Sequence, residues 1–302
     1  MSWARNRRTR VRTLAEQDSR QFIFNDASSG RVHFETEGYA IFRNVLDADL
    51  IGEARRHVDW LLEKNPGTRP EQLHHTLMTD DPFWVRLISD DRLLEVAAQF
   101  LGPNLALFAS HYICKRPYDG QAVLWHQDGS YWPLEPMEVV TLWLALDDTD
   151  PENGCMRVLP RTQQMRLLTE AELIEQKDDK NVLGSGIDPA QIDESQAVDV
   201  RLRAGDVSVH HPNVIHGSTA NTSARWRRGL TIRYIPAATR ILSETPFPSA
   251  FMLRGQAVAG VNVYQRWPGY VEGKHMPFRD WREWNQQCER KNEEYGAFLV
   301  KQ

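Results

Sequence analysis

The chain has 302 residues, of which 41% are hydrophobic and 25% are charged, a balance typical of a folded globular protein rather than a disordered one. The formal net charge of −5 gives no general attraction for phosphate backbones, so nucleic acid is not an expected partner. The three cysteines, Cys114, Cys155 and Cys288, are widely spaced and match neither a disulfide framework nor a zinc finger. No apolar run approaches the roughly 20 residues of a membrane span. We therefore expect a soluble, cytoplasmic protein without membrane contact.

Residues 1–32 form a basic segment with five arginines in its first twelve positions and no apolar run behind them. This pattern excludes a secretory signal, and it predicts a flexible, solvated tail. An organelle transit peptide is the alternative interpretation. The remainder, residues 33–302, is expected to form a single domain.

The domain is predicted to begin with a helical front at residues 33–103. A short strand is expected around Tyr39–Phe42, followed by a helix that Asp47 or Asp49 caps. A second helical stretch is predicted over residues 81–101, because proline stands in its first turn and glycine follows its last residue.

From residue 104 the hydrophobic period changes to two, and seven short apolar runs follow before residue 236. They predict a curved antiparallel barrel or sandwich with flanking helices, which is a mainly β fold. Residues 163–196 begin as a helical stretch and become polar, which is typical of a lid-like insertion. Residues 237–302 are expected to form an irregular extension and a closing helix.

The pair His126 and Asp128 lies at the end of one of these runs, and His216 follows a later strand. Residues i and i+2 of a strand face the same side, so His126 and Asp128 point in one direction. Two histidines and one carboxylate are the ligand set of non-haem Fe(II), and they leave positions open for a chelating cosubstrate and dioxygen. The alternative for an isolated pair of this kind is a hydrogen-bonded polar strand end.

The residues after His216 indicate what the cosubstrate is. Ser218 lies two positions further on, and Arg227 opens the next strand. An arginine fork with a nearby hydroxyl suits the distal carboxylate of 2-oxoglutarate. Inward-facing Thr141 and Trp143 are expected to line the same site. The alternatives are a surface ion pair for Arg227 and an ordinary core position for Trp143.

Strand periodicity also predicts which side chains face the interior of the barrel. In the strand that Arg227 opens, Leu230, Ile232 and Tyr234 should pack beneath helices, while Thr231 and Arg233 should face inward with Arg227.

These motifs together resemble the phytanoyl-CoA dioxygenase family of Fe(II)/2-oxoglutarate oxygenases. The resemblance covers roughly residues 33–236 and is carried by HFETEGYAIFRNVL, WHQDGSYW, TLWLALDDTDPENGCMRVLP and AGDVSVHHPNVIHGSTANTSARWRRGLTIRY. It implies a double-stranded β-helix, a jelly-roll of the cupin-like kind. It also implies that iron is held by His126, Asp128 and His216 and 2-oxoglutarate by Arg227 and Ser218, with Lys115 as a further cosubstrate contact.

The carboxylate of Asp128 bears on the type of reaction. Halogenating relatives carry a small residue at this position so that chloride can bind the iron. We therefore predict a hydroxylase that oxidises a C–H bond of a small metabolite, in specialised metabolism, and releases succinate and carbon dioxide. Desaturation, cyclisation and epimerisation remain alternatives, and the sequence does not determine the oligomeric state.

The substrate is predicted to contact Tyr131, Trp132 and His111. His210 and His211 are expected to be structural residues, with a supporting role behind the metal ligands as the alternative. His74 and His75 are expected to be surface residues. Two rival functions remain open. One is a barrel that binds a partner without catalysis, and the other is a cupin-type metallo-dioxygenase that needs no cosubstrate.

Overall fold

A computed structural model of the chain describes residues 27–175, 182–243 and 247–301. The arginine-rich stretch of the predicted tail lies outside these residues. The boundary predicted at residue 32 is wrong, because helix α2 (Ala27–Glu37) already begins at Ala27. The physical reason is that Phe34 is buried and its ring lies 4.6 Å from that of Phe100, which anchors the helix to the domain.

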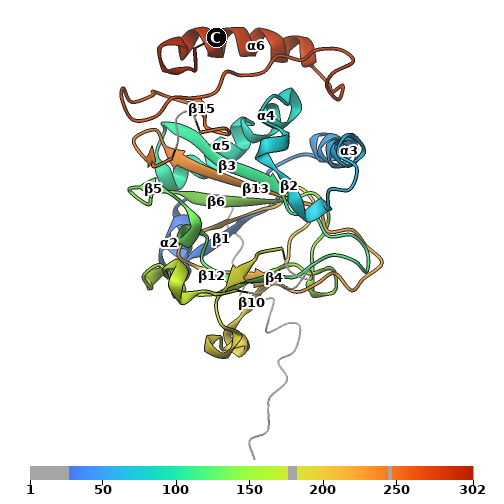
Figure 1. The fold of residues 1–302 in the computed structure, drawn as a ribbon, viewed down its shortest axis with the longest axis vertical. Helices are drawn as coiled ribbons and strands as arrows, with labels where there is room; N and C mark the ends of the chain where they lie inside the picture. The colour runs from blue at the N-terminus through green and yellow to red at the C-terminus, as the bar shows by residue number, and fades with distance from the viewer. Residues whose placement is uncertain (1–26, 176–181, 244–246, 302) are drawn as a thin grey trace, which may run out of the picture.

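Two antiparallel sheets form the centre of the molecule, as the predicted double-stranded β-helix requires (Figure 1). The larger sheet has the order β1 (Tyr39–Phe42), β11 (Val207–His210), β6 (Val140–Ala145), β13 (Gly229–Pro236), β3 (Leu105–Tyr112) and β15 (Phe251–Arg254), with β2 (Leu73–His74) also paired to β3. The smaller sheet has the order β10 (Val198–Val200), β7 (Met156–Leu159), β12 (Ile215–Ser218) and β4 (Val123–His126). Side chains of both sheets, among them Trp143 and Val158, pack together in one buried cluster between them.

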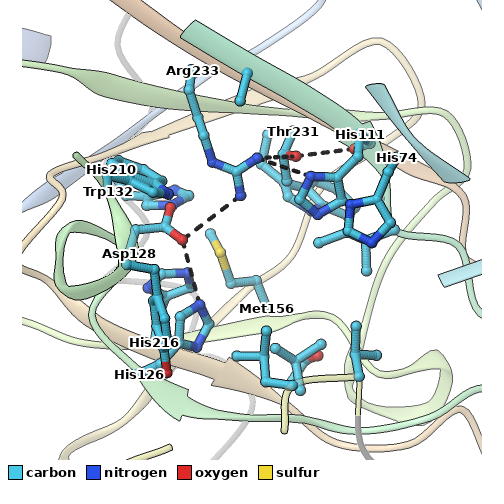
Figure 2. A pocket seen from close by; sticks show the side chains of 18 of the residues that line it. His74, His111, His126, Asp128, Trp132, Met156, His210, His216, Thr231 and Arg233 are labelled. Atoms are coloured by element: carbon cyan, nitrogen blue, oxygen red, sulfur yellow. Dashed lines mark hydrogen bonds and ion pairs between the residues drawn. The ribbon is translucent and has the colours of Figure 1, made fainter. Parts of the chain in front are cut away.

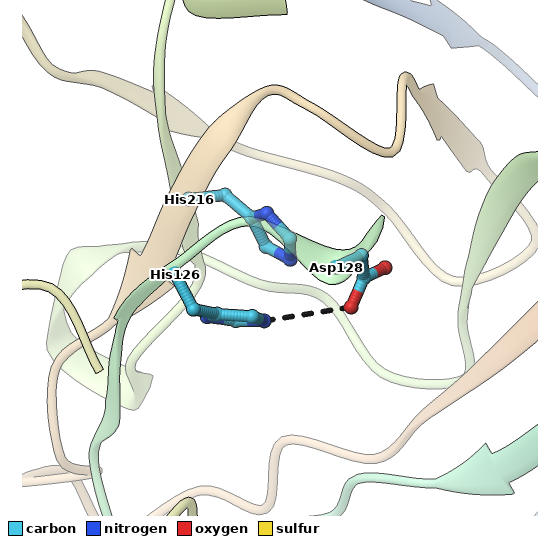
Figure 3. Close-up of side chains that lie close together, drawn as sticks. All are labelled: His126, Asp128 and His216. Atoms are coloured by element: carbon cyan, nitrogen blue, oxygen red, sulfur yellow. Dashed lines mark ion pairs between the residues drawn. The ribbon is translucent and has the colours of Figure 1, made fainter. Parts of the chain in front are cut away.

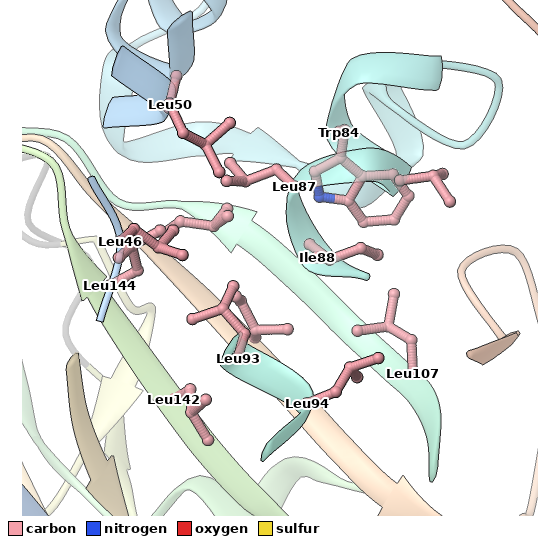
Figure 4. Close-up of a cluster of buried hydrophobic side chains, with 14 of the residues drawn as sticks. Leu46, Leu50, Trp84, Leu87, Ile88, Leu93, Leu94, Leu107, Leu142 and Leu144 are labelled. Atoms are coloured by element: carbon pink, nitrogen blue, oxygen red, sulfur yellow. The ribbon is translucent and has the colours of Figure 1, made fainter. Parts of the chain in front are cut away.

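Helices cover the outer face of the larger sheet (Figure 1). They are α3 (Ala48–Lys64), α4 (Pro82–Ile88) and α5 (Asp91–Leu101). Leu87 and Leu93 of the last two helices pack with Leu107 and Leu142 of the sheet in the main hydrophobic core (Figure 4). The prediction of one helix over residues 81–101 is wrong, because Asp90 accepts a hydrogen bond from the Arg92 amide and starts a new helix.

The predicted facing of β13 and β6 agrees with this packing. Leu230, Ile232 and Tyr234 belong to the core beneath the helices. Thr231 and Arg233 instead line a cavity between the sheets. The alternation of a β-strand therefore separates a packing face from a polar interior face on the same strand.

The insertion at 163–196 is described except for residues 176–181, and its predicted helical start is wrong. Its described part contains single 3-10 turns, η5 (Thr162–Gln164), η6 (Glu170–Glu172), η7 (Pro189–Gln191) and η8 (Glu194–Gln196), and a two-residue ladder of β8 (Ile174–Glu175) with β9 (Ser185–Gly186). Ile187 packs against Trp125 and Ile215, so the insertion is fastened to the smaller sheet by apolar contacts rather than by helix formation.

The C-terminal extension contains more order than predicted. Strand β15 adds to the edge of the larger sheet, and β14 (Arg240–Ile241) pairs with β5 (Leu134–Glu135). The predicted closing helix is α6 (Trp281–Glu294), which lies beyond β15 at the top of Figure 1. Its Trp284 stacks on Trp267 at 5.4 Å. Among the described residues, no helix combines the length and hydrophobicity needed to cross a bilayer.

Asp47 caps helix α3, because its side chain accepts a hydrogen bond from the Leu50 amide. We expect Asp47→Ala to lower the free energy of unfolding by about 1 kcal/mol, the usual loss for such a cap. Asp49→Ala is the matched control, since Asp49 stands in the first turn and pairs with Arg279 at the surface. Urea denaturation of both variants checks this; a larger loss for Asp49→Ala would contradict the capping assignment.

Candidate metal centre

Three side chains from two distant parts of the chain converge at one point between the sheets (Figure 3). His126 ends β4, Asp128 begins the turn η3 (Asp128–Tyr131), and His216 lies on β12 directly opposite His126 in the ladder. All three are buried, and one potential ligand atom from each lies within 4.8 Å of the other two. The convergence predicted from the sequence is therefore present.

Backbone carbonyl groups orient both imidazoles. His126 Nδ1 lies 2.7 Å from the Leu124 carbonyl oxygen, and His216 Nδ1 lies 3.1 Å from that of Val214. With Nδ1–H donating to these oxygens, the lone pair of each Nε2 is free to bind a metal. Burial, together with His126 and His210 nearby, lowers the pKa of His216 well below its ordinary value, which keeps this imidazole neutral and able to ligate.

The Oδ2 oxygen of Asp128 is held by two neighbouring side chains. Oδ2 accepts a hydrogen bond from the Thr141 hydroxyl at 3.0 Å and lies 3.3 Å from His210 Nε2, while Oδ1 lies 3.5 Å from His126 Nε2. Burial alone would raise the pKa of Asp128, but the charge of Arg233 and the neighbouring imidazoles lower it well below the ordinary value. The carboxylate is thus ionised, with Oδ1 directed toward the two histidines.

Two assignments from the sequence change here. Thr141 was predicted to line the cosubstrate site, but its hydroxyl contacts Asp128 instead. His210 was expected to be structural, but its position favours the alternative of a residue that supports the ligands, because it is buried beside the same carboxylate and its ring centroid lies 4.5 Å from that of His216. The alternation of β11 carries the signal that could have found it, since Val207 and Val209 face the outer core and leave His210 facing inward.

Thr141→Val removes the hydroxyl that orients Asp128 while keeping the side-chain volume. We expect the affinity for Fe(II), or for Co(II) as an air-stable probe, to fall roughly 10- to 100-fold, the usual effect of losing such a supporting hydrogen bond. Thr239→Val is the control, because Thr239 is equally buried but its hydroxyl donates to the Glu138 carbonyl outside the site. Metal competition titrations distinguish the two; equal affinities would show that Thr141 has no part in metal binding.

Arg227 lies in the same cavity and has an unusual lack of partners. Its side chain is only 2% exposed, its Nε and Nη2 have no hydrogen-bond partner among the described residues, and its guanidinium group lies 5.3 Å from the Trp143 ring centroid. No carboxylate of the described chain forms an ion pair with it, so the alternative of a surface ion pair is not supported. Burial lowers the pKa of Arg227 to about 10, which leaves it charged at neutral pH. A buried, unpaired guanidinium requires an anion.

Lys115 and Ser218 stand next to Arg227. The Lys115 ammonium group donates to the Ser218 hydroxyl at 2.7 Å and to the Thr219 carbonyl, and the Lys115 backbone pairs with that of Arg227. Gly229 makes room for the Trp143 ring, because a Cβ at this position would lie 2.1 Å from it. Of the predicted cosubstrate residues, Arg227, Ser218 and Trp143 line the cavity. Lys115 is not part of the lining, but it orients the Ser218 hydroxyl through its hydrogen bond.

The cavity that joins these groups has a volume of about 370 Å³, within the range of small-molecule sites (Figure 2). Its lining includes the predicted substrate residues Tyr131, Trp132 and His111, whose role as substrate contacts stays a prediction. His74 and His75 also line it, which the sequence did not predict, although His74 is exposed as expected of a surface residue. The reason is the two-residue strand β2, which pairs His74 with His111 and is too short to be recognised from periodicity.

The donor set fits a divalent transition metal. Two imidazoles and one carboxylate meet at the wall of a cavity. Nitrogen and oxygen ligands in this number are typical of non-haem Fe(II) centres with open positions. The unpartnered Nε and Nη2 of Arg227 would be satisfied by an anion in the same cavity.

Sequence comparison identifies relatives of the chain. A sequence model of the phytanoyl-CoA dioxygenase family matches residues 34–229, which is more than half of the chain. A curated protein of Stutzerimonas stutzeri, described as "Probable alpha-ketoglutarate-dependent hypophosphite dioxygenase", is 30% identical over 151 residues, covering 50% of this chain and 52% of that protein. The chain thus spans about half the length of this relative.

Comparison of structures gives the same fold. The non-heme monooxygenase ThoJ in its apo form has a TM-score of 0.66 and 23% identity, covering 89% of this chain and 96% of that chain. The epimerase SnoN, in complex with Fe3+, alpha-ketoglutarate and nogalamycin RO, has a TM-score of 0.59 and 22% identity, covering 76% and 94%. At such identities the similarity concerns the fold alone, and it confirms the predicted double-stranded β-helix.

Proposed function

The chain belongs to the phytanoyl-CoA dioxygenase family of Fe(II)/2-oxoglutarate oxygenases, and on this basis we propose that it uses one ferrous ion and 2-oxoglutarate to oxidise a small organic molecule with dioxygen. Residues 33–302 would act as one oxygenase domain. The single observation that carries the proposal is the pairing of a His-Asp-His cluster with a buried, unpaired arginine in one cavity. The distal carboxylate of 2-oxoglutarate would supply the anion that this arginine lacks.

We assign each residue of the site a role in binding iron or the cosubstrate. His126, Asp128 and His216 hold the iron, and Arg227 with the Ser218 hydroxyl binds the distal carboxylate of 2-oxoglutarate. Lys115 orients Ser218, and Trp143 supports the guanidinium group from its ring face. The bound iron and cosubstrate supply the oxidising power, and succinate and carbon dioxide are the coproducts. The buried surroundings exclude bulk water from the reacting groups.

Hydroxylation is the reaction that we propose. The ionised carboxylate of Asp128 occupies the position that a halide would need, which argues against halogenation. A fold neighbour named as an epimerase illustrates that other outcomes occur on this fold, so the product itself must be identified. Mass spectrometry would show a gain of one oxygen atom for hydroxylation and none for epimerisation.

The cavity also favours a compact organic substrate. Its volume of about 370 Å³ must hold the cosubstrate as well, and its walls include the aromatic rings of Phe108, Trp132 and Phe247. Such walls suit an apolar body more than an inorganic oxyanion. The cavity is small for a coenzyme A thioester.

Anaerobic addition of Fe(II) and 2-oxoglutarate tests the proposal. A weak visible charge-transfer band of the iron–cosubstrate chelate is expected, and Zn(II) in place of Fe(II) should give none. A partner-binding barrel without a metal centre, or a metallo-dioxygenase that needs no cosubstrate, would produce no band with either ion. Absence of the band at saturating iron would therefore overturn the proposed function.

A further inference from the structure

A second buried arginine, Arg233, lines the same cavity as Arg227 (Figure 2). It lies on β13, six residues after Arg227, which precedes that strand. It is 7% exposed. Its Nη1 donates to His111 Nδ1 at 3.0 Å and to the Thr231 hydroxyl at 3.2 Å, which fixes the plane of the guanidinium group. Its Nε has no hydrogen-bond partner among the described residues.

Asp128 is an incomplete counter-ion for Arg233. Arg233 Nη2 lies 3.8 Å from Asp128 Oδ1, which is too long for a hydrogen bond. This is also the oxygen directed toward His126 and His216, where the metal would bind. Asp128 is the sole carboxylate in the described lining of the cavity. The charge of Arg233 is therefore poorly compensated once that carboxylate serves a metal.

The count of formal charges leads to the same point. Fe(II), Arg227 and Arg233 would contribute four positive charges and the Lys115 ammonium group beside Ser218 a fifth, whereas Asp128 and the dianion of 2-oxoglutarate would contribute three negative ones. Arg233 is left without an anion of its own in this count, because the cosubstrate's distal carboxylate is assigned to Arg227. A buried positive charge of this kind is stabilised by an anionic ligand.

The residues around Arg233 indicate the chemical character of the rest of such a ligand. Burial, followed by the charge of Arg233, lowers the pKa of His111 well below its ordinary value, and burial, followed by His74 and Arg233, lowers the pKa of His75 to about 4. These imidazoles are neutral at pH 7, and His75 Nδ1 has no partner among the described residues. The Trp132 ring lies 5.1 Å from the Arg233 guanidinium group, and Phe108 stacks on Phe247 at 5.0 Å beside it.

We propose that this part of the cavity is a substrate carboxylate site: Arg233 binds the carboxylate of an organic acid whose apolar part lies between Trp132, Phe108 and Phe247. The substrate class is thus a small carboxylic acid with an aromatic or aliphatic body. That this acid is the substrate rests on the proposed function. Binding of a carboxylate depends only on these residues, so it can be measured without turnover.

Isothermal titration of the anaerobic Fe(II)- and 2-oxoglutarate-loaded protein tests this, with benzoate and benzamide as a charged and a neutral probe of equal shape. Benzoate is expected to bind roughly tenfold more tightly or better, since a charge-assisted hydrogen bond in a buried site has about this effect. Arg233→Gln should remove the preference. Arg254→Gln, at a surface arginine paired with Glu95, should keep it.

Three results would overturn the proposal: equal binding of the two probes, binding of neither at millimolar concentration, or a preference for benzoate that survives in Arg233→Gln. The last would indicate direct binding of benzoate to the metal. If Arg233→Gln does not fold, Arg233→Met, which keeps the bulk of the side chain without its charge, replaces it in the same comparison. Zn(II)-loaded protein separates the two proposals, because a carboxylate preference there without a chelate band in the Fe(II) form would retain the site and reject the oxygenase function.

Discussion

Replacing His126 with alanine is expected to abolish iron-dependent succinate formation. The imidazole is one of three ligands that meet within 4.8 Å, and its Nε2 is presented to the metal by the bond between Nδ1 and the Leu124 carbonyl. Loss of a direct ligand should weaken metal binding by more than the roughly 10- to 100-fold that follows loss of a supporting residue. Succinate release from 2-oxoglutarate, measured with the bound iron content, checks both effects.

His275→Ala is the matched control for this substitution. His275 is also buried, but it accepts a hydrogen bond from the Val271 amide in the C-terminal extension, outside the cavity. The thermal transition gives an independent readout. Saturating Fe(II) should stabilise the unaltered protein and the control, by about 2.7 kcal/mol at a hundredfold excess over Kd, and should leave His126→Ala unchanged. Full succinate formation by His126→Ala would place the iron elsewhere and reject the proposed ligand set.

Arg227→Ala is expected to raise the KM for 2-oxoglutarate roughly 30-fold or more. Removing one partner of a buried, hydrogen-bonded charge pair usually costs about 2–5 kcal/mol of binding free energy, because the other charge is left unpaired. Arg227 has two guanidinium nitrogens without partners among the described residues, and these are the atoms available to the cosubstrate. Succinate formation over a wide range of 2-oxoglutarate concentrations measures the effect.

Two further variants make the result specific. Arg227→Met keeps the bulk of the side chain on Trp143 but lacks the charge, so it should resemble Arg227→Ala. Arg228→Ala changes the next residue, which pairs with Asp147 outside the cavity, and should leave the KM unchanged. If Arg227→Ala also leaves the KM unchanged, Arg233 would be the cosubstrate anchor, and the carboxylate site proposed for it would have to be abandoned.

Local periodicity explains why much of the site could be predicted. In a strand the side chains alternate between two faces, so the pattern of apolar residues in β13 assigns Thr231 and Arg233 to the interior without any knowledge of neighbouring strands. The same rule predicted His126 and Asp128 on one side, although Asp128 lies in the turn η3 just after β4. The sequence also named His216 as the partner histidine, and the register that sets His216 opposite His126 agrees with it.

Contacts between distant strands could not be predicted in this way. His210 and Thr141 face inward by periodicity, but that both meet Asp128 depends on the pairing of β11 with β6 and on the turn that carries Asp128. His74 reaches the cavity through a two-residue strand that has no period of its own. The tail boundary was misplaced for a similar reason, because α2 is anchored by a ring contact with residue 100.

The sequence by itself therefore determined the family, the alternating faces of the strands and the ligand types, since these depend on residue identity and on spacing within one strand. Only the tertiary structure decided that Lys115 donates to Ser218, that His210 and Thr141 contact Oδ2 of Asp128, and that Arg227 and Arg233 line one cavity. These contacts depend on the register between strands far apart in the chain, which a single sequence does not specify residue by residue.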